Sequence, residues 1–205
     1  MGGSPEGFNR IAREVFAPIY PVIADRLLGW SGARDGLALD IGSGPGLLGF
    51  ALARKSNLSC IALDSDPAMA AICRRNAAEE GLSTRICPVL ADVHRMPLKA
   101  DSIALAVSRG SVFFWGDRSC AFREIERVLR PGGVAYVGGS FGSAPLRDEI
   151  FAEMRRRNPH WDEDVQRRSG SLPHSLLFQE LEKSGVAASR IREEEAGWWV
   201  EIRKC

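Results

Sequence analysis

One stretch constrains this chain more than any other: a short apolar strand that runs through a glycine-rich turn into a helix. Residues 37–41 are apolar except for Asp40, as expected of a parallel strand covered on both faces. The turn contains Gly42, Gly44 and Gly46, which have no Cβ and let a ligand approach the backbone. The first turn of the following helix presents free N–H groups and a positive dipole end. We therefore expect an anionic or carboxylate-bearing cofactor over this turn, which should face solvent when empty.

The glycine spacing separates this turn from the similar turn of dinucleotide-binding domains. The dinucleotide pattern is G-x-G-x-x-G, whereas Leu47 stands at the sixth place here. The run 40–46 (DIGSGPG) instead resembles the first motif of class I S-adenosylmethionine-dependent methyltransferases. The resemblance implies that S-adenosyl-L-methionine is bound by Asp40, Gly42, Ser43, Gly44 and Gly46. A tight turn without a ligand is the alternative, but such a turn needs only one glycine.

The next predicted strand, Leu58–Leu63, is followed by an acidic residue, Asp64. Asp64 lies about 20 residues beyond the glycine turn, the separation at which a carboxylate reaches a ribose in a nucleotide-binding βαβ unit. In the methyltransferase family that the chain resembles, the acidic residue at the end of the second strand binds both ribose hydroxyls, and Asp64 is the matching residue. We expect Asp66 to be the N-cap of the next helix. We expect Ser65 and Met69 beside the cofactor, with Met69 packed on the adenine.

A third strand, Arg85–Leu90, leads into a loop over residues 91–98. This loop resembles the family's adenine motif, in which an acidic side chain accepts the exocyclic amino group and the next residue's backbone meets the ring. The matching residues are Asp92 and Val93, and we expect His94 at the cofactor as well. A general base is an alternative role for His94, because an unperturbed histidine titrates near neutrality. A place beside the adenine, however, is far from the methyl group.

A fourth strand, 102–107, leads into the loop 108–115. Ligands of doubly wound sheets bind at the carboxyl ends of the strands where the strand order reverses, so this loop should face the reactive end of the cofactor. The loop lacks the Asn-Pro-Pro-Tyr-like sequence of family members that methylate amide or ring nitrogens, which argues against a nucleic-acid enzyme. We expect Ser108 at the cofactor, and the candidate catalytic residues are Tyr20, Arg109, Ser111 and Trp115.

No histidine or carboxylate is placed near the expected methyl position by the sequence. Such a site favours an acceptor that is already an anion or ionises easily, such as an acid or a thiol, and Arg109 would orient it. The alternative is that Arg109 ties the loop to a carbonyl or carboxylate. For Phe113 and Phe114 core packing is the favoured interpretation.

The N-terminal residues 5–30 have apolar residues at helical spacing and predict two short helices with breaks at Pro18 and Pro21. The segment 16–21 permits two interpretations. It is either a hydrophobic packing corner or a cover over the cofactor mouth that offers the Tyr20 hydroxyl to a substrate.

Farther along, a helix ends at the run 130–133 (RPGG) before a strand at 134–137, which resembles the fifth-strand motif of small-molecule methyltransferases. The resemblance thus covers residues 36–139 in order, and the stretches FAPIYP and SRGSVFFW resemble a subgroup without an assigned substrate. It implies an α/β fold: a doubly wound, Rossmann-like, seven-stranded, mostly parallel sheet with helices on both faces. The last strand, 197–202, should run antiparallel between strands five and six.

We expect one methyltransferase domain over 1–205. Its predicted parts are an N-terminal helical cover (1–30), a cofactor-binding core (31–139), a lid insert (140–173) and a C-terminal helix with strands (174–205). Lys and Arg number 27 against 26 Asp and Glu, so nothing in the net charge attracts nucleic acid or an anionic membrane. The five cysteines lack C-x-x-C and metal spacing, which indicates buried thiols, no metal and a cytoplasmic protein.

The sequence therefore predicts methyl transfer from S-adenosyl-L-methionine to a small molecule. Two other classes stay open. A nicotinamide-dependent oxidoreductase would share the glycine turn and the ribose carboxylate but would lack the Asp92 motif. A cofactor-binding protein without turnover would have the same sequence features through the fifth strand. The acceptor and the oligomeric state are not indicated by any motif.

Overall fold

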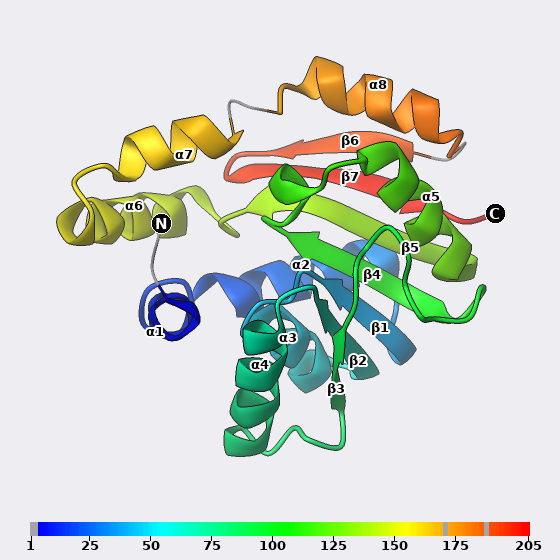
Figure 1. The fold of residues 1–205 in the computed structure, drawn as a ribbon, viewed down its shortest axis with the longest axis horizontal. Coiled ribbons are helices and arrows are strands. Elements are labelled where there is room, and N and C mark those ends of the chain that lie inside the picture. The colour runs from blue at the N-terminus through cyan, green and yellow to red at the C-terminus, as the bar shows by residue number, and fades with distance from the viewer. Residues whose placement is uncertain (1–3, 170–171, 187–188) are drawn as a thin grey trace.

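The structure is a computed structural model, and it describes residues 4–169, 172–186 and 189–205. Residues 1–3, 170–171 and 187–188, which belong to the predicted cover, insert and C-terminal segment, lie outside the described residues. The described chain folds around a seven-stranded sheet with the order β3-β2-β1-β4-β5-β7-β6 (Figure 1). The predicted α/β class is therefore confirmed.

The strands are β1 (Asp35–Ile41), β2 (Asn57–Asp64), β3 (Ile86–Leu90), β4 (Ile103–Arg109), β5 (Leu129–Ser140), β6 (Ser189–Glu194) and β7 (Gly197–Arg203). The helices are α1 (Pro5–Glu14), α2 (Ile19–Ser31), α3 (Leu47–Lys55), α4 (Pro67–Glu79), the single 3₁₀ turn η1 (Val112–Phe114), α5 (Arg118–Val128), α6 (Ala144–Arg157), α7 (Trp161–Ser169) and α8 (His174–Ser184). Strand β5 begins at Leu129 and therefore includes the Pro-Gly-Gly run. The sequence instead predicts that this strand begins after the run, at residue 134. The pairing of β4 with β5 shifts register across this run.

The strand directions match the sequence-based prediction. Strands β1 to β5 pair in parallel, whereas β7 runs antiparallel between β5 and β6. The chain leaves β1 for β2 on one side, and β4 lies on the other side of β1. This reversal beside β1 opens a crevice at the carboxyl ends of these strands, which is where doubly wound sheets bind ligands.

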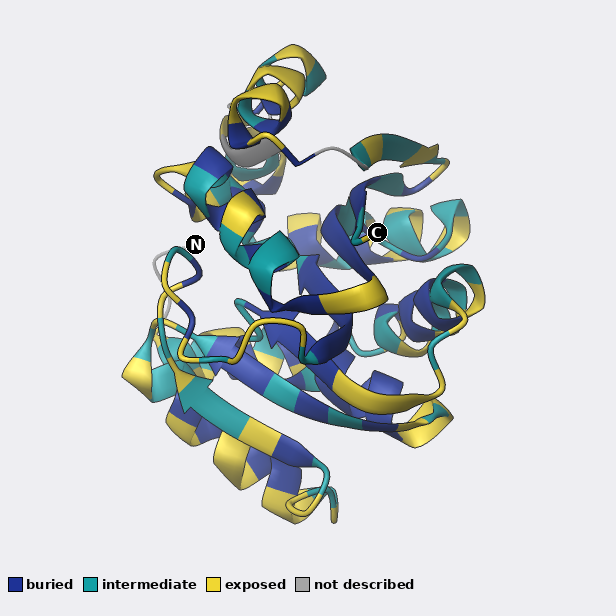
Figure 2. Ribbon diagram, turned by 90° about the vertical axis from the view of Figure 1, so that its right-hand side faces the viewer, coloured by how far each residue is buried: buried dark blue, intermediate teal, exposed yellow. Residues whose placement is uncertain are grey.

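Two hydrophobic cores cover the two faces of the sheet. Alternation along β1 divides its side chains, with Ala38 in one core and Leu39 and Ile41 in the other. Helices α2, α3 and α4 contribute to the first core, and α5 and α8 contribute to the second. Figure 2 shows the central strands buried between these layers. The near-continuous apolar run of β1 thus reflects burial on both faces.

The N-terminal segment forms the two predicted helices, but one of the two predicted breaks is wrong. Pro18 is the N-cap of α2, and the chain turns between α1 and this residue. Pro21 lies inside the first turn of α2, where a backbone N–H has no helical partner and proline is tolerated. The predicted N-cap at Asp66 is confirmed, since its carboxylate accepts the Ala68 N–H at 2.8 Å.

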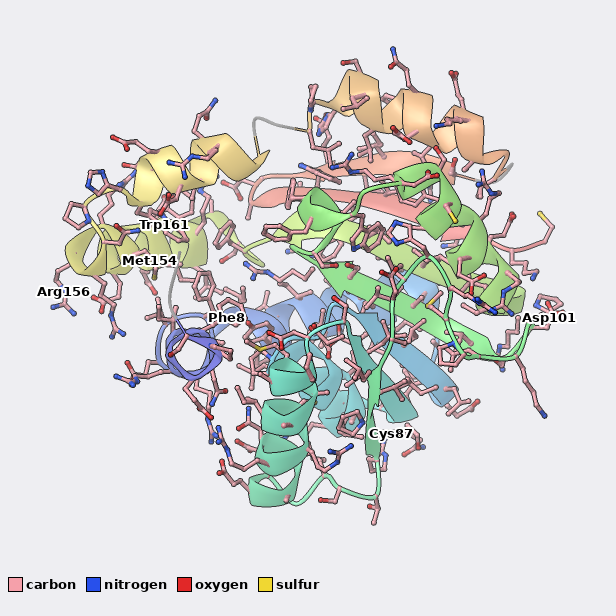
Figure 3. All side chains as sticks on the ribbon, in the orientation of Figure 1. Phe8, Cys87, Asp101, Met154, Arg156 and Trp161 are labelled. Carbon is pink, nitrogen blue, oxygen red and sulfur yellow. The ribbon has the colours of Figure 1, made fainter. Side chains whose placement is uncertain are left out.

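The predicted lid insert forms α6 and α7, which pack against the N-terminal segment. The Phe16 ring lies 6.3 Å from both the Phe141 and the Trp161 rings, measured between centroids. Met154 and Trp161 are buried in this contact, at the α6–α7 end of the molecule (Figure 3). Phe16 therefore belongs to a packing corner, one of the two interpretations of segment 16–21. None of the described helices is both long and apolar enough to cross a membrane.

Candidate functional site

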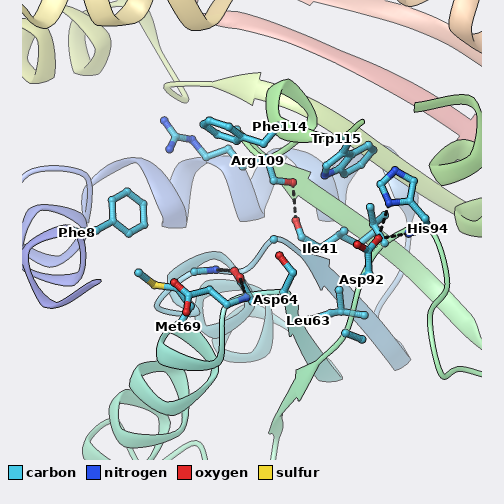
Figure 4. A pocket seen from close by; sticks show the side chains of 18 residues that line it. Phe8, Ile41, Leu63, Asp64, Met69, Asp92, His94, Arg109, Phe114 and Trp115 are labelled. Atoms are coloured by element: carbon cyan, nitrogen blue, oxygen red, sulfur yellow. Dashed lines mark hydrogen bonds and ion pairs between the residues drawn. The ribbon is translucent and has the colours of Figure 1, made fainter. Parts of the chain in front are cut away.

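A cavity of about 550 Å³ lies at the carboxyl ends of β1, β2 and β4 (Figure 4). Most of the predicted site residues line it: Gly42, Gly44, Asp64, Ser65, Met69, Asp92, Val93, His94, Arg109, Ser111 and Trp115. They come from segments that are separated by up to about a third of the chain in sequence. The topology brings them together because parallel strands end at the same edge of the sheet.

The glycine loop forms the floor of the cavity and is attached to the neighbouring strands. The N–H groups of Gly42 and Ser43 both donate to the Leu63 carbonyl, at 2.8 and 3.0 Å. Gly42 has a left-handed φ of 66°, and a Cβ there would lie 2.3 Å from the Cβ of Ser111. A side chain at this position is excluded by the protein itself, because the loop after β4 packs directly on the loop after β1.

Gly44 lies where the loop meets both Asp64 and the N-terminal helix. Its N–H donates to Asp64 Oδ2 at 2.7 Å, and a Cβ on Gly44 would lie 3.2 Å from the Phe8 ring. Gly44 is buried. The expectation that the empty turn faces solvent is therefore wrong at this residue, because α1 carries Phe8 over it.

The adenine-motif residues form a hydrogen-bonded pair at one end of the cavity. Asp92 Oδ1 accepts the His94 N–H at 2.8 Å and lies 2.5 Å from His94 Nδ1. The backbone hydrogen bond from His94 is the main cause that lowers the pKa of Asp92. His94 Nε2 accepts the Asp117 N–H at 3.3 Å, so His94 joins the loop after β3 to the start of α5.

Ser111 lines the cavity, but its hydroxyl proton is used within the protein. Ser111 Oγ donates to the Ile41 carbonyl at 3.1 Å. The 2.5 Å contact between Ser111 and Ser108 then requires the Ser108 hydroxyl to be the donor, because a hydroxyl has only one proton. This chain of hydrogen bonds ties the end of β4 to the end of β1. Both hydroxyls can accept a further hydrogen bond, but neither has a free proton to donate.

Arg109 lies at the end of β4 and faces the cavity from a firmly packed position. Its Nε donates to the Ser140 carbonyl at 3.1 Å. The guanidinium carbon lies 5.3 Å from the centre of the Phe16 ring and 5.2 Å from that of Phe141, which is cation–π distance. The alternative that Arg109 ties its loop to a carbonyl is therefore realised in the structure. The same side chain still lines the cavity.

The remaining predicted site residues do not line this cavity: Tyr20, which lines a second cavity with Pro21 and Leu47, and Asp40, Ser43, Gly46 and Ser108. Asp40 is 2% exposed and its Oδ2 accepts the Gly49 N–H at 3.0 Å. Burial raises the pKa of Asp40 to about 7, although this hydrogen bond acts in the opposite direction. Burial also raises the pKa of the Tyr20 hydroxyl, with the Arg109 charge opposing it. A Cβ on Gly46 would meet Cys73 and Phe50, so this glycine serves internal packing.

Seven residues that line the cavity were not predicted as site residues: Phe8, Ile41, Leu63, Asp66, Ala91, Gly110 and Phe114. The two aromatic ones, Phe8 and Phe114, change the character of the cavity most. Phe8 is 40% exposed and points into the cavity from α1, and Phe114 is 71% exposed (Figure 4). The expected core packing of Phe114 is therefore wrong. Helix α1 is held in place by Asn76 of α4, whose amide donates to Asn9 Oδ1 and to the Pro45 carbonyl at 2.9 and 3.1 Å. The apolar spacing in α1 was a usable signal for a packed helix, but not for the direction of Phe8.

The donor and acceptor groups of the cavity suit an adenosine with an amino-acid tail. Carboxylates lie at Asp92 and Asp64, next to the ends of β3 and β2, and the loop of Gly42 and Gly44 follows at the end of β1. These groups match, in this order, an amino group on a base, a pair of ribose hydroxyls and a zwitterionic tail. Met69 supplies an apolar surface at the same wall. The residues present therefore fit S-adenosyl-L-methionine.

Comparison with known proteins agrees with this match. Residues 39–137 match the family model described as a methyltransferase domain. A crystal structure from Methanococcus maripaludis, of a candidate S-adenosyl-L-methionine-dependent methyltransferase, is 42% identical, covers 98% of this chain and 91% of its own, and superposes with a TM-score of 0.91. An uncharacterized chloroplastic methyltransferase of Arabidopsis thaliana is 34% identical over 113 residues, which are 53% of this chain and 32% of the relative.

A malonyl-[acyl-carrier protein] O-methyltransferase of Methylovorus sp. is also 34% identical, over 60% of this chain and 42% of its own length. The chain thus spans less than half of these two curated relatives, and their acceptors do not transfer with the fold. The Methanococcus protein is matched along nearly its whole length. On that match, and on the sheet order and the site that accompany it, the chain belongs to the class I S-adenosylmethionine-dependent methyltransferases, whose cofactor is S-adenosyl-L-methionine.

Proposed function

We propose that this chain transfers the methyl group of S-adenosyl-L-methionine to a small acceptor that is an anion or a thiol. The observation that carries the proposal is one cavity with the cofactor-type groups Asp92, Asp64 and Gly44 at one side and Arg109 and Phe114 at the other. The second set provides a cationic and an apolar surface at the end of β4. An acceptor held there would lie beside the reactive end of the cofactor.

The bound cofactor supplies an activated methyl group on a sulfonium, so the chain has to align two reactants and keep water out. Asp64 and Asp92 would hold the ribose and the base through charge-assisted hydrogen bonds. The Ser108–Ser111–Ile41 chain fixes the end of β4 relative to β1. Phe8 and Phe114 would reduce the water content at the cavity mouth.

The choice of an acidic or thiol acceptor rests on the groups near Arg109. Ser111 and Ser108 carry alcohol hydroxyls, which are too weakly basic to take a proton from an acceptor, and the imidazole of His94 lies beside Asp92 at the other end (Figure 4). An acceptor that ionises easily needs no general base. Arg109 would attract its negative charge, and Phe114 would contact its apolar part.

We further propose that the acceptor is neither nucleic acid nor a membrane component and that the protein is cytoplasmic. The near-zero net charge supports the first statement. The five cysteines, all unpaired in the structure, fit a reducing compartment.

Calorimetry followed by an acceptor screen tests the proposal. The wild-type chain is titrated with S-adenosyl-L-homocysteine and, in parallel, with NAD; we expect binding of the first alone. Turnover is then measured by the release of S-adenosyl-L-homocysteine with panels of thiols, carboxylic acids, phenols and amines. Methylation of thiols or acids supports the acceptor class, whereas methylation restricted to amines contradicts it. Binding without turnover on any panel favours a cofactor-binding protein.

A further inference from the structure

We propose that His94 is the residue that makes this site selective for adenine, by holding the Asp92 carboxylate where it accepts the 6-amino group of the base. The inference rests on the proposed placement of the base at Asp92. It gives His94 a positioning role, since its imidazole acts on the ligand through Asp92 and carries out no step of methyl transfer.

Two donors of His94 converge on one oxygen of Asp92. The backbone N–H and Nδ1 of His94 lie 2.8 and 2.5 Å from Asp92 Oδ1 (Figure 4). Among the described residues, Asp92 Oδ2 has no hydrogen-bond partner, and the Asp92 side chain is 63% exposed at the cavity. A carboxylate held at one oxygen therefore presents the other oxygen to a ligand.

A single tautomer of His94 satisfies both of its ring contacts. The Asp117 N–H is a donor and lies 3.3 Å from His94 Nε2, so this nitrogen must be the acceptor. Nδ1 then carries the proton and donates it to Asp92. The Asp117 N–H thus orients the neutral His94 ring at one side, and the ring orients the Asp92 carboxylate at the other side.

The backbone group at the far side of the ring belongs to a well-defined element. Asp117 is the N-cap of α5, and its carboxylate accepts the Cys120 N–H at 2.9 Å. Trp115, two residues earlier, lines the same cavity and packs on Phe122 of α5 at a centroid distance of 6.2 Å. His94 therefore links the Asp92 loop to a wall that is itself anchored, and this restricts how far the Asp92 carboxylate can turn.

The consequence for the ligand follows from hydrogen-bond chemistry. Adenine has a donor at position 6, and a fixed carboxylate oxygen accepts it. Hypoxanthine has a carbonyl oxygen at position 6, which faces the carboxylate as a second acceptor and leaves both groups unpaired. If His94 is removed, the exposed Asp92 side chain can turn to solvent, and the penalty for hypoxanthine falls.

The test compares S-adenosyl-L-homocysteine with S-inosyl-L-homocysteine, using calorimetry on the full chain. Glutamine at position 94 can donate its amide N–H to Asp92 and accept the Asp117 N–H, whereas leucine can do neither. We expect wild type and His94→Gln to prefer the adenosyl ligand by at least about tenfold. In His94→Leu the preference should fall by about tenfold, through weaker binding of the adenosyl ligand together with a smaller penalty for the inosyl ligand.

Further variants keep the result decisive. His94→Ala removes the same ring contacts and replaces His94→Leu should that variant not fold. Asp92→Asn offers an amide N–H to the 6-oxo group and should shift the preference toward the inosyl ligand. If Asp92→Asn shifts the preference but both apolar variants at position 94 keep the wild-type ratio, or weaken both ligands equally, the role of His94 is rejected. If Asp92→Asn has no effect, the base does not lie at Asp92 and the proposed cofactor placement fails with it.

Discussion

The carboxylate of Asp64 accepts the backbone N–H of Gly44 at 2.7 Å, so the acid at the end of β2 holds the glycine loop that follows β1. Its second oxygen accepts the Asp66 N–H at 2.9 Å, just before α4. Each carboxylate oxygen has a further lone pair for a ribose hydroxyl. One side chain therefore both shapes the empty loop and, in the proposed function, binds the cofactor.

Asp64→Ala should weaken S-adenosyl-L-homocysteine binding by about 2–3 kcal/mol, because two charge-assisted hydrogen bonds are lost. It should also lower the free energy of unfolding by about 1 kcal/mol, since the Gly44 N–H loses its acceptor. Calorimetry and urea denaturation measure the two effects. Ser143→Ala is the control, because it removes the N-cap of another helix, α6, at a residue that does not line the cavity. Wild-type affinity in Asp64→Ala would refute the ribose assignment.

Gly44→Val should abolish cofactor binding and lower the free energy of unfolding by at least 1–2 kcal/mol, the approximate cost of a left-handed residue with a Cβ. Gly44 has a φ of 53° and its Cβ would lie 3.2 Å from the Phe8 ring. Comparing Gly44→Ala with Gly81→Ala separates the cost of the left-handed backbone from the cost of the contact with Phe8. Gly81 has a φ of 68° and no atom within 4 Å of an added Cβ, so only the backbone cost applies there.

Gly44→Ala should lower the free energy of unfolding more than Gly81→Ala does. This excess should disappear when Gly44→Ala is combined with Phe8→Ala. Thermal or urea denaturation of the single and double variants gives this coupling. Equal effects of Gly44→Ala and Gly81→Ala, with cofactor binding retained, would mean that α1 does not press on the loop.

Asp40 should make the protein less stable as the pH rises. Burial raises the pKa of Asp40 from 3.8 to about 7, so the folded state holds this proton up to neutral pH while the unfolded state loses it near pH 4. The stabilisation is complete below about pH 4 and is lost between about pH 4 and 7, with an upper limit of about 4 kcal/mol. Asp40→Asn keeps an acceptor for the Gly49 N–H and does not titrate.

Urea denaturation of wild type and Asp40→Asn between pH 4 and pH 8 measures this difference. We expect similar stabilities at pH 4 and an increasing advantage for Asp40→Asn toward pH 8. Parallel curves across this range would show that Asp40 does not bind a proton in the folded state.

Arg109→Ala should leave the affinity for S-adenosyl-L-homocysteine unchanged and raise the acceptor KM, because the cationic group lost lies at the end of β4. It should also lower the free energy of unfolding, since the Ser140 contact and the stacking on Phe16 and Phe141 disappear. Arg109→Lys keeps the charge but not the planar stack. Recovery of KM in the lysine variant, without recovery of stability, would separate the two roles; loss of cofactor affinity instead contradicts the acceptor role.

The sequence alone was sufficient for the fold and for much of the cavity lining. The run DIGSGPG, the acid at Asp64 and the motif at Asp92 each stand at the end of an apolar strand. Parallel strands end at one edge of the sheet, so local patterns placed these residues together without a model of the packing. The antiparallel position of β7 followed from the resemblance and is confirmed.

Only the tertiary structure decided what each side chain does with its polar atoms. Asp40 and Ser108 were expected at the cofactor, but they lie behind the wall, because the side chain of a residue in a motif can point to either face of a loop. Phe8 is 36 residues from Gly44, and its approach depends on the buried Asn9–Asn76 contact between α1 and α4. Strand periodicity and turn chemistry are local and can be read along the chain. The direction of a side chain across two packed elements depends on contacts between residues distant in sequence, and no local pattern encodes them.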